Sequence, residues 1–299
     1  MNTLHFLCVK SMKKGGICME TNGILVLQSD FGLVDGAVAA MTGVALSVDP
    51  LLRVYNLTHE IPPYDTFEAS YRLLQAVPYW PEGTVFVSVV DPGVGSKRKS
   101  VVARTGRGQL IVSPDNGTLT HIDRVIGIEE VREIEESVGR RRDSEHSWTF
   151  HGRDVYAYTG ALLASGKLQL EDIGPSFDPK DIIRLEGKKA VLEGNAITGT
   201  IETLDVRFGS LWTDISRKLF EKLNVKVHEQ VDVSIYRGKT RVYHSFVTYG
   251  HTFAEVEIGE PLLYVNSMDH IGLAINQGNF AKAYNIGTRD PWVIRLEKR

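Results

Sequence analysis

The 299-residue sequence lacks the features that mark several large classes of protein. Its two cysteines, Cys8 and Cys18, provide neither a disulfide framework nor the paired spacing of a metal site. The net charge is -3, so there is no basic surplus to indicate nucleic acid as a partner. No apolar run approaches the roughly 20 residues of a membrane-spanning helix. We therefore expect a cytoplasmic globular protein that binds neither nucleic acid nor membrane and has no metal site.

Common catalytic signatures are missing as well. The sequence contains no His-Glu-x-x-His, Cys-x-x-Cys or Gly-x-Ser-x-Gly motif, which leaves zinc hydrolysis and serine esterase chemistry without a basis. It also lacks the Gly-x-Gly-x-x-Gly pattern of dinucleotide-binding loops. The residues that remain for chemistry are aspartates at the ends of predicted strands.

The most informative stretch is 23–36, where an apolar run leads into an acidic, glycine-containing turn. The run from Ile24 lacks polar alternation, which is typical of a strand buried on both faces in a parallel sheet. Residues 37–48 then have helical spacing. Because ligands of open α/β sheets bind at the carboxyl ends of strands, Asp30 and Asp35 are candidate contacts for a cationic or hydroxyl-rich ligand. The alternative is structural, with Asp30 capping the helix and Asp35 serving as a first-turn acid.

A second helix is predicted over 66–77. Asp65 can cap it, with Glu68 at the capping-box position. Arg72 follows Asp65 by two helical turns, so the two side chains can face one cleft. His151 precedes a further apolar helix, where it is either poised for a site or an ordinary hydrogen-bonded residue.

Composition divides the chain into four parts. We expect residues 1–22 to be a flexible extension, 23–176 an α/β domain, 177–189 a linker and 190–299 an all-β domain with barrel-like strand spacing. Three finer expectations concern single segments: an irregular segment over 128–147 whose Arg140-Arg141-Arg142 run is a solvated loop face, a helix over 215–223, and a strand over 253–258.

Seven short motifs follow one another along the chain. They are Ser29-Asp30-Phe31-Gly32, Asp35-Gly36, His59-Glu60-Ile61-Pro62-Pro63 with Asp65, Asp91-Pro92-Gly93-Val94-Gly95, Pro114-Asp115-Asn116-Gly117, Phe150-His151-Gly152-Arg153-Asp154 and Phe208-Gly209-Ser210-Leu211-Trp212-Thr213. Each motif is weak alone, whereas the ordered set is specific. From about residue 23 to 290 the chain resembles the S-adenosylmethionine hydroxide adenosyltransferase family, which is related to fluorinase and chlorinase.

The resemblance implies a Rossmann-like amino-terminal domain, a carboxy-terminal β-barrel and a homotrimer that binds S-adenosyl-L-methionine (SAM) between subunits. It implies that SAM is the substrate, that water converts it to adenosine and L-methionine, and that no further cofactor takes part. The implied catalytic set is Asp65, Arg72 and His151. The implied substrate contacts are Asp30 at the ribose diol, Asp35 and Asp205 at the methionine ammonium, Ser267 at its carboxylate, Ser210 and Asn276 near the adenine, and, without an assigned group, Tyr64 and Phe208.

The sequence departs from fluorinase where a halide would bind. His151-Gly152 stand where fluorinase has Tyr-Ser, Arg72 stands in place of a tyrosine, and Asp91-Pro92-Gly93-Val94 replace Tyr-Pro-Ala-Thr. Met268 replaces an arginine beside the carboxylate serine. Because the lost hydroxyls would have contacted a halide, we expect water to be the nucleophile.

Three alternatives stay open. The first is an adenosyltransferase that uses a halide. The second is a non-enzymatic module that binds SAM. The third is a metal-dependent phosphoesterase, since carboxylate clusters bind divalent ions, built on Asp30, Asp65, Asp91, Asp115 and His151.

Overall fold

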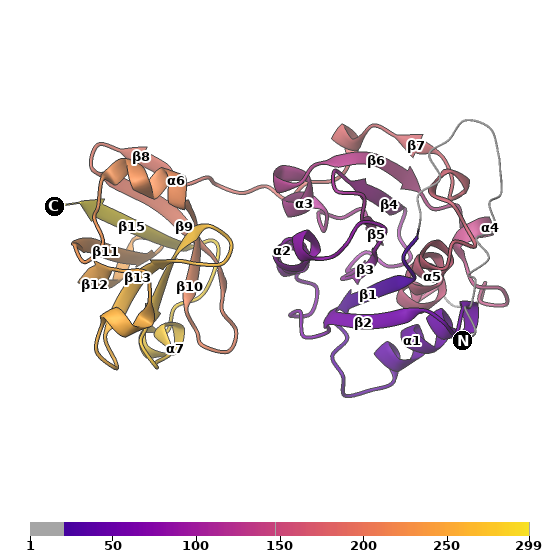
Figure 1. The fold of residues 1–299 in the computed structure, drawn as a ribbon, viewed down its shortest axis with the longest axis horizontal. Helices are drawn as coiled ribbons and strands as arrows, with labels where there is room; N and C mark the ends of the chain where they lie inside the picture. The colour runs from indigo at the N-terminus through magenta and orange to yellow at the C-terminus, as the bar shows by residue number, and fades with distance from the viewer. Residues whose placement is uncertain (1–20, 147, 299) are drawn as a thin grey trace, which may run out of the picture. The chain divides into compact units, whose positions relative to one another are not determined.

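The computed structural model describes residues 21–146 and 148–298. The chain divides into two compact units, with the boundary between Leu185 and Glu186 (Figure 1). Almost all of the predicted extension 1–22 lies outside the described residues. Each unit has its own sheet and its own hydrophobic core. In the part of the chain that is described, no helix is both long and apolar enough to cross a membrane.

The first unit is built on a seven-stranded sheet with the order β2-β1-β3-β5-β4-β6-β7. The four strands β2, β1, β3 and β5 run parallel, and the other three pair antiparallel. The predicted α/β fold with parallel strands is therefore confirmed. The strands are β1 (Ile24–Ser29), β2 (Arg53–Thr58), β3 (Val85–Val89), β4 (Ser100–Thr105), β5 (Leu110–Pro114), β6 (Ile128–Glu133) and β7 (Ser176–Phe177).

Helices cover both faces of this sheet. α1 packs beside α5 on one face, and α2 packs beside α3 on the other (Figure 1). The helices are α1 (Ala37–Val48), α2 (Thr66–Ala76), α3 (Thr120–Val125), α4 (Glu136–Gly139) and α5 (Tyr158–Ala164). Short segments are the 3-10 turns η1 (Val77–Tyr79), η3 (Leu170–Asp172) and η4 (Pro179–Asp181), and the π-helical turn η2 (Gly152–Ala157), which runs directly into α5.

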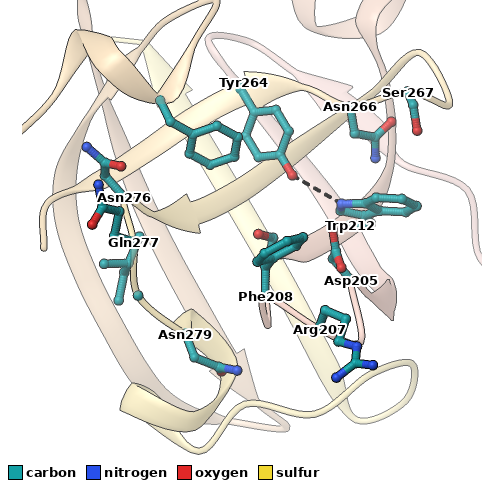
Figure 2. A pocket seen from close by; sticks show the side chains of 14 residues that line it. Asp205, Arg207, Phe208, Trp212, Tyr264, Asn266, Ser267, Asn276, Gln277 and Asn279 are labelled. Carbon is teal, nitrogen blue, oxygen red and sulfur yellow. Dashed lines mark hydrogen bonds between the residues drawn. The ribbon is translucent and has the colours of Figure 1, made fainter. Parts of the chain in front are cut away.

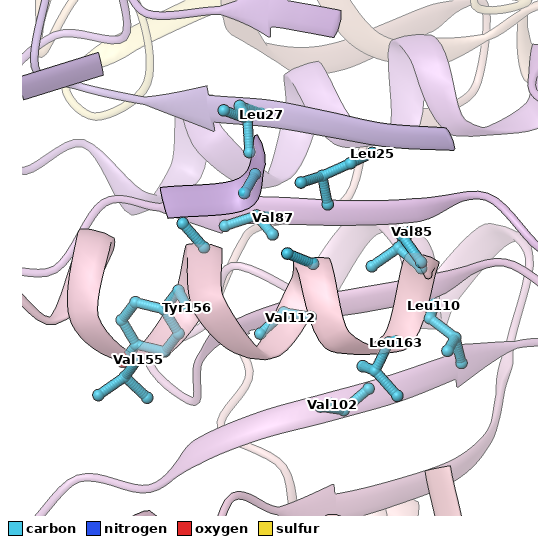
Figure 3. Close-up of a cluster of buried hydrophobic side chains, with 14 of the residues drawn as sticks. Leu25, Leu27, Val85, Val87, Val102, Leu110, Val112, Val155, Tyr156 and Leu163 are labelled. Atoms are coloured by element: carbon cyan, nitrogen blue, oxygen red, sulfur yellow. The ribbon is translucent and has the colours of Figure 1, made fainter. Parts of the chain in front are cut away.

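The apolar core explains why β1 reads as an uninterrupted hydrophobic run. All six residues of β1 are buried, because helices lie on both faces of the strand. Leu25, Val85 and Val87 face the helical segment that carries Tyr156 and α5 (Figure 3). Gly160 of α5 is needed there, because a Cβ would lie 2.4 Å from the Val87 Cγ2 atom.

The second unit is a closed β-barrel. Its strands follow the order β10-β14-β13-β12-β11-β15-β9, and an additional pairing of β9 with β10 closes the ring. The predicted barrel is thus confirmed, and β8 pairs with β9 outside the ring. The strands are β8 (Val191–Glu193), β9 (Ala196–Leu204), β10 (Leu211–Ser216), β11 (Gln230–Arg237), β12 (Thr240–Tyr249), β13 (Pro261–Val265), β14 (His270–Ile275) and β15 (Trp292–Lys298), with the short helices α6 (Arg217–Phe220), η5 (Glu221–Leu223), η6 (Phe253–Glu255) and α7 (Phe280–Tyr284).

Two expectations about single segments are wrong. The predicted strand over 253–258 begins instead with η6, because Thr252 and Glu255 form a capping box that starts a helical turn. The segment 128–147 is not irregular throughout, because β6 pairs with β4 despite its charged residues. β6 lies between β4 and the two-residue β7, and only Val131 of its six residues is buried, so its charged side chains reach solvent without loss of the backbone pairing.

Candidate functional site

The loop after β1 carries the first two predicted ligand contacts. Asp30 Oδ2 accepts a hydrogen bond from the Tyr64 backbone N–H at 2.9 Å, and Tyr64 has a positive φ of 68°. Asp30 therefore fixes the neighbouring loop and does not cap α1, which begins after Gly36. Asp35 Oδ1 accepts from the Ala37 N–H at 2.9 Å. The Tyr64 side chain is 72% exposed, so its ring is available to a ligand.

The start of α2 carries the predicted aspartate and arginine. Asp65 Oδ1 accepts from the Glu68 N–H at 3.0 Å, so the predicted helix cap is confirmed. Arg72 lies one turn beyond Glu68, and its Nε atom is 3.1 Å from Glu68 Oε2. A second guanidinium nitrogen donates to Gln75 Oε1 at 3.0 Å. These contacts orient the guanidinium of Arg72 along the helix that Asp65 starts.

The loop that carries His151 packs against the loop that carries Asp30. The Phe150 ring meets the Phe31 ring edge-on, with centroids 5.7 Å apart. A Cβ on Gly152 would lie 3.0 Å from two Phe31 ring atoms, so glycine at this position permits the approach. His151 then leads into η2, and π-helical turns are frequent at functional sites. Two predicted site residues, Asp30 and His151, are thus brought together through the aromatic residues beside them.

His151 lies between two arginines and is only 5% exposed. Its Nε2 atom is 3.1 Å from Arg140 Nη2, and its Nδ1 atom is 3.5 Å from Arg98 Nη2. Burial, then the cations of Arg140 and Arg98, lower the pKa of His151 below its ordinary value. The imidazole is therefore neutral at neutral pH.

Arg140 corrects the expectation of a solvated arginine run. Its side chain is only 5% exposed, and it donates to Glu136 Oε2 at 2.7 Å and to the Ser144 carbonyl at 3.2 Å. Its guanidinium also lies over the Trp148 ring. Arg141 pairs with the buried Asp154. Only the third arginine of the run is exposed, because the loop folds back toward η2.

Arg98 was not among the predicted site residues. All three nitrogen atoms of its guanidinium donate hydrogen bonds. It forms a bidentate ion pair with Asp91, in which Nε donates to Oδ1 at 2.7 Å and Nη2 donates to Oδ2. Its Nη1 atom donates to Ser100 Oγ at 2.9 Å, and Ser100 is hydrogen-bonded to the Tyr156 hydroxyl. The strand-end motif that contains Asp91 therefore positions an arginine beside His151. No signal in the sequence pairs these residues, because Arg98 belongs to no motif.

The barrel holds a pocket of about 850 Å³ that gathers five of the predicted substrate contacts (Figure 2). These are Asp205, Phe208, Ser210, Ser267 and Asn276. Sequence reasoning missed further lining residues of two kinds: aromatic rings and side-chain amides. They include Trp212, Phe253 and Tyr264, with Asn266, Gln277 and Asn279.

The pocket suits a flat polar ring joined to a charged group. Trp212 Nε1 donates to the Tyr264 hydroxyl at 3.1 Å, which fixes two rings across the pocket (Figure 2). The carboxylate of Asp205 supplies a negative charge, and amide groups can both donate and accept hydrogen bonds. An adenine with a nearby ammonium matches this combination of stacking surface and polar groups.

The donor set of the phosphoesterase alternative is dispersed. Among the described residues, no three His, Cys, Asp or Glu side chains come together in a way that could hold a metal ion. Asp91 is bound to Arg98, and Asp115 accepts from the Ile183 N–H at 2.9 Å. The five residues proposed for that alternative therefore do not form a carboxylate cluster in the described part of the chain.

Comparison with known families agrees with the motifs. Residues 25–174 match the SAM hydroxide adenosyltransferase N-terminal domain, and residues 199–293 match the C-terminal domain of the same family. The two matches cover most of both units.

Individual relatives cover nearly the whole chain. A protein of Salinispora tropica named (R)-S-adenosyl-L-methionine hydrolase is 36% identical over 265 residues, which are 88% of this chain and 94% of that protein. A fluorinase of Actinoplanes sp. is 29% identical over 294 residues, covering 90% and 96%. The crystal structure of an uncharacterized conserved protein from Thermotoga maritima has a TM-score of 0.84 at 31% identity and covers 92% of this chain and 100% of that chain.

Proposed function

Because the chain belongs to the SAM hydroxide adenosyltransferase family, we propose that it hydrolyses S-adenosyl-L-methionine to adenosine and L-methionine. In the proposed reaction, water or hydroxide attacks the 5′ carbon in line with the departing sulfur. The single observation that best supports this assignment within the structure is the barrel pocket, because five residues that the family resemblance implies as substrate contacts line it together.

The proposed substrate contacts divide between the two units. Asp30 binds the ribose diol, while its Oδ2 atom keeps the hydrogen bond from the Tyr64 N–H. Asp35 and Asp205 bind the methionine ammonium, and Ser267 binds its carboxylate. Around the adenine we place Tyr64 and three residues of the barrel pocket, Phe208, Ser210 and Asn276.

The proposed chemistry follows from the substrate. The sulfonium leaves as a neutral thioether, so the leaving group needs no general acid. The difficulty lies in the nucleophile, because water is weak and hydroxide is scarce at neutral pH. Arg72 stabilises an anionic oxygen, His151 contacts the attacking water, and Asp65 holds the start of α2. Near-attack positioning of two reactants supplies roughly 7 kcal/mol or more of the barrier reduction.

We propose the R configuration at sulfur for the substrate, because the hydrolase relatives carry that prefix in their names. Separate incubation with each sulfonium epimer tests this point. Consumption of the R epimer at a rate at least tenfold higher supports it, whereas equal rates for the two epimers contradict it.

We propose water over halide as the nucleophile despite the fluorinase relatives. His151 and Gly152 occupy the positions where fluorinase has hydroxyl-bearing side chains. A dominant 5′-halo-adenosine product in chloride or fluoride would contradict this assignment.

We also propose a homotrimer whose site is shared between subunits. The support is that the proposed contacts fall on two separate units of the chain. Light scattering combined with activity measurements tests the assembly, since a fully active monomer would contradict it.

Product analysis tests the activity itself. Purified protein is incubated with SAM in the presence of a chelator, and the products are separated by chromatography. Equal amounts of adenosine and methionine are expected. S-adenosylhomocysteine would indicate methyl transfer, loss of turnover in chelator would indicate a metal, and binding without turnover would indicate a non-enzymatic module.

A further inference from the structure

The two neighbours of His151 are both donors. A guanidinium carries five N–H groups, accepts no hydrogen bond and stays protonated in proteins. His151 nevertheless has one ring nitrogen 3.1 Å from Arg140 Nη2 and the other 3.5 Å from Arg98 Nη2. The protonation state of the imidazole must therefore accommodate a donor on each side.

The shorter contact determines the tautomer. At 3.1 Å from Arg140 Nη2, the Nε2 atom of His151 accepts a hydrogen bond and so carries no proton. A neutral imidazole has one ring proton, which is then on Nδ1. The opposite tautomer would direct an Nε2–H at the Arg140 donor, and an imidazolium would direct an N–H at both arginines.

The arginines themselves are fixed. Arg140 is tied to Glu136 at 2.7 Å, and Arg98 is tied to Asp91 by two hydrogen bonds. These two carboxylates are the acidic groups near His151, and each is occupied by its own arginine. With the proton on Nδ1, this atom and Arg98 Nη2 are two donors 3.5 Å apart, and an oxygen atom that contacts both can accept from each.

We propose that Arg140 and Arg98 are positioning residues that hold His151 as its neutral Nδ1-protonated tautomer, so that His151 donates a hydrogen bond to the attacking oxygen and does not act as its general base. This inference rests on the proposed hydrolysis of SAM. It specifies the contact of His151 with the attacking water as that of a donor to a developing anion.

The reaction balances without a proton on His151. The water oxygen forms a bond to the 5′ carbon, the bond from that carbon to sulfur breaks, and its electron pair stays on sulfur. The sulfonium becomes the neutral thioether of methionine. The one proton that the water oxygen loses passes to solvent.

The tautomer can be observed directly in the unaltered protein. Nitrogen-15 NMR of histidine-labelled protein distinguishes Nδ1–H, Nε2–H and imidazolium forms, and the His151→Asn variant identifies the His151 signals by their loss. The Nδ1–H form is expected at pH 7 to 8. An Nε2–H or imidazolium form at pH 7 would overturn the proposal, whatever the activity of the protein.

Two substitutions of His151 separate the donor role from the base role. An asparagine amide can place an N–H near the position of Nδ1 but is not a base at neutral pH. His151→Asn is therefore expected to keep kcat within about tenfold of the unaltered enzyme, whereas His151→Ala is expected to lose roughly 100-fold. Equal losses in both variants would overturn the donor role, and an unchanged kcat in both would remove His151 from the proposed function.

Arg140→Met tests the positioning, with Arg142→Met as the matched control from the exposed end of the same run. Removal of the Arg140 cation and donor is expected to raise the pKa of His151 and to mix its tautomers in the NMR spectrum. It is expected to lower kcat about tenfold while KM changes less than twofold. The control is expected to match the unaltered protein. A His151 spectrum unchanged in folded Arg140→Met would contradict the positioning role.

Discussion

At the scale of single residues, Asp30 has a structural role and a proposed binding role. One carboxylate oxygen accepts from the Tyr64 N–H, and the rest of the group is proposed to receive the ribose diol. Asp30→Asn retains an oxygen for Tyr64 but loses the charge. Because a diol contact acts equally in the ground and transition states, we expect KM to rise at least tenfold with a smaller change in kcat. Steady-state kinetics and calorimetric SAM titration measure both, and an unchanged KM would contradict the assignment.

Arg72 is expected to act mainly on the transition state. Arg72→Ala removes a donor to the developing anion, and such a loss costs about 3 kcal/mol, or roughly 100-fold in kcat. Arg72→Lys should restore only part of the rate, because an ammonium lacks the planar fork of donors. Kinetics with an independent SAM affinity measurement separates kcat from binding. A wild-type kcat in Arg72→Ala would exclude Arg72 from the chemistry.

The residue scale also shows where the sequence was informative. Asp65 was predicted as a helix cap because the signal is local, and the cap is present. Arg140 was misjudged because a run of charges contains no information about which member folds inward. Arg98 was missed for a related reason, since its ion pair with Asp91 depends on how the loop between them folds and its contact with His151 on a segment distant in the sequence.

At the scale of structural elements, η2 depends on a small residue at its start. A Cβ on Gly152 would press on Phe31, at 3.0 Å, and on Val89, at 3.3 Å. Gly152→Ala should therefore displace the Phe31 ring beside Asp30, destabilise the protein by roughly 1 to 3 kcal/mol and raise KM.

Gly43→Ala on α1 is the control for this substitution. No atom lies within 4 Å of its Cβ position, and alanine favours a helix interior over glycine. This variant should gain roughly 0.5 to 1 kcal/mol. Denaturant unfolding of both variants measures the changes, and equal stability of the two would contradict the packing argument.

The residue that follows β2 makes the stability of the fold depend on pH. His59 is buried directly after the strand, with Nδ1 2.7 Å from Ser29 Oγ, and burial lowers its pKa to about 4. The unfolded chain therefore binds the extra proton first as pH falls. The contribution to stability is complete above about pH 6.5 and is lost progressively toward pH 4, by roughly 2 kcal/mol after allowance for solvent screening.

His59→Asn should remove this slope, because asparagine does not titrate. His251→Asn is the control, since His251 is exposed. Urea unfolding between pH 4.5 and 7.5 measures the slope for each protein. A slope that persists unchanged in His59→Asn would assign the pH dependence to other groups.

Elements were predicted well where one local signal dominates. The helix over 37–48 and the apolar β1 follow from spacing and from hydrophobic continuity, and both are present. β6 was missed because a strand with four charged residues among its six lacks these patterns. The turn η6 was taken for a strand because the Thr252–Glu255 capping box was overlooked among β-branched neighbours.

At the scale of the whole molecule, the chain joins an α/β unit, which carries the proposed catalytic residues, to a barrel that holds a ring-lined pocket. The order of motifs along the sequence indicated both units and the family to which they belong. Spacing along the chain could not show the convergence of five residues in the barrel pocket, because they lie in loops that come together only when β14 pairs with β10 and β13.

The central claim is that an oxygen from water becomes the 5′ oxygen of adenosine. Turnover of SAM in oxygen-18 water, followed by mass spectrometry of both products, tests it most directly. The account predicts one oxygen-18 atom in adenosine and none in methionine, at a rate proportional to enzyme concentration. Unlabelled adenosine, or methylthioadenosine as the enzyme-dependent product, would contradict it.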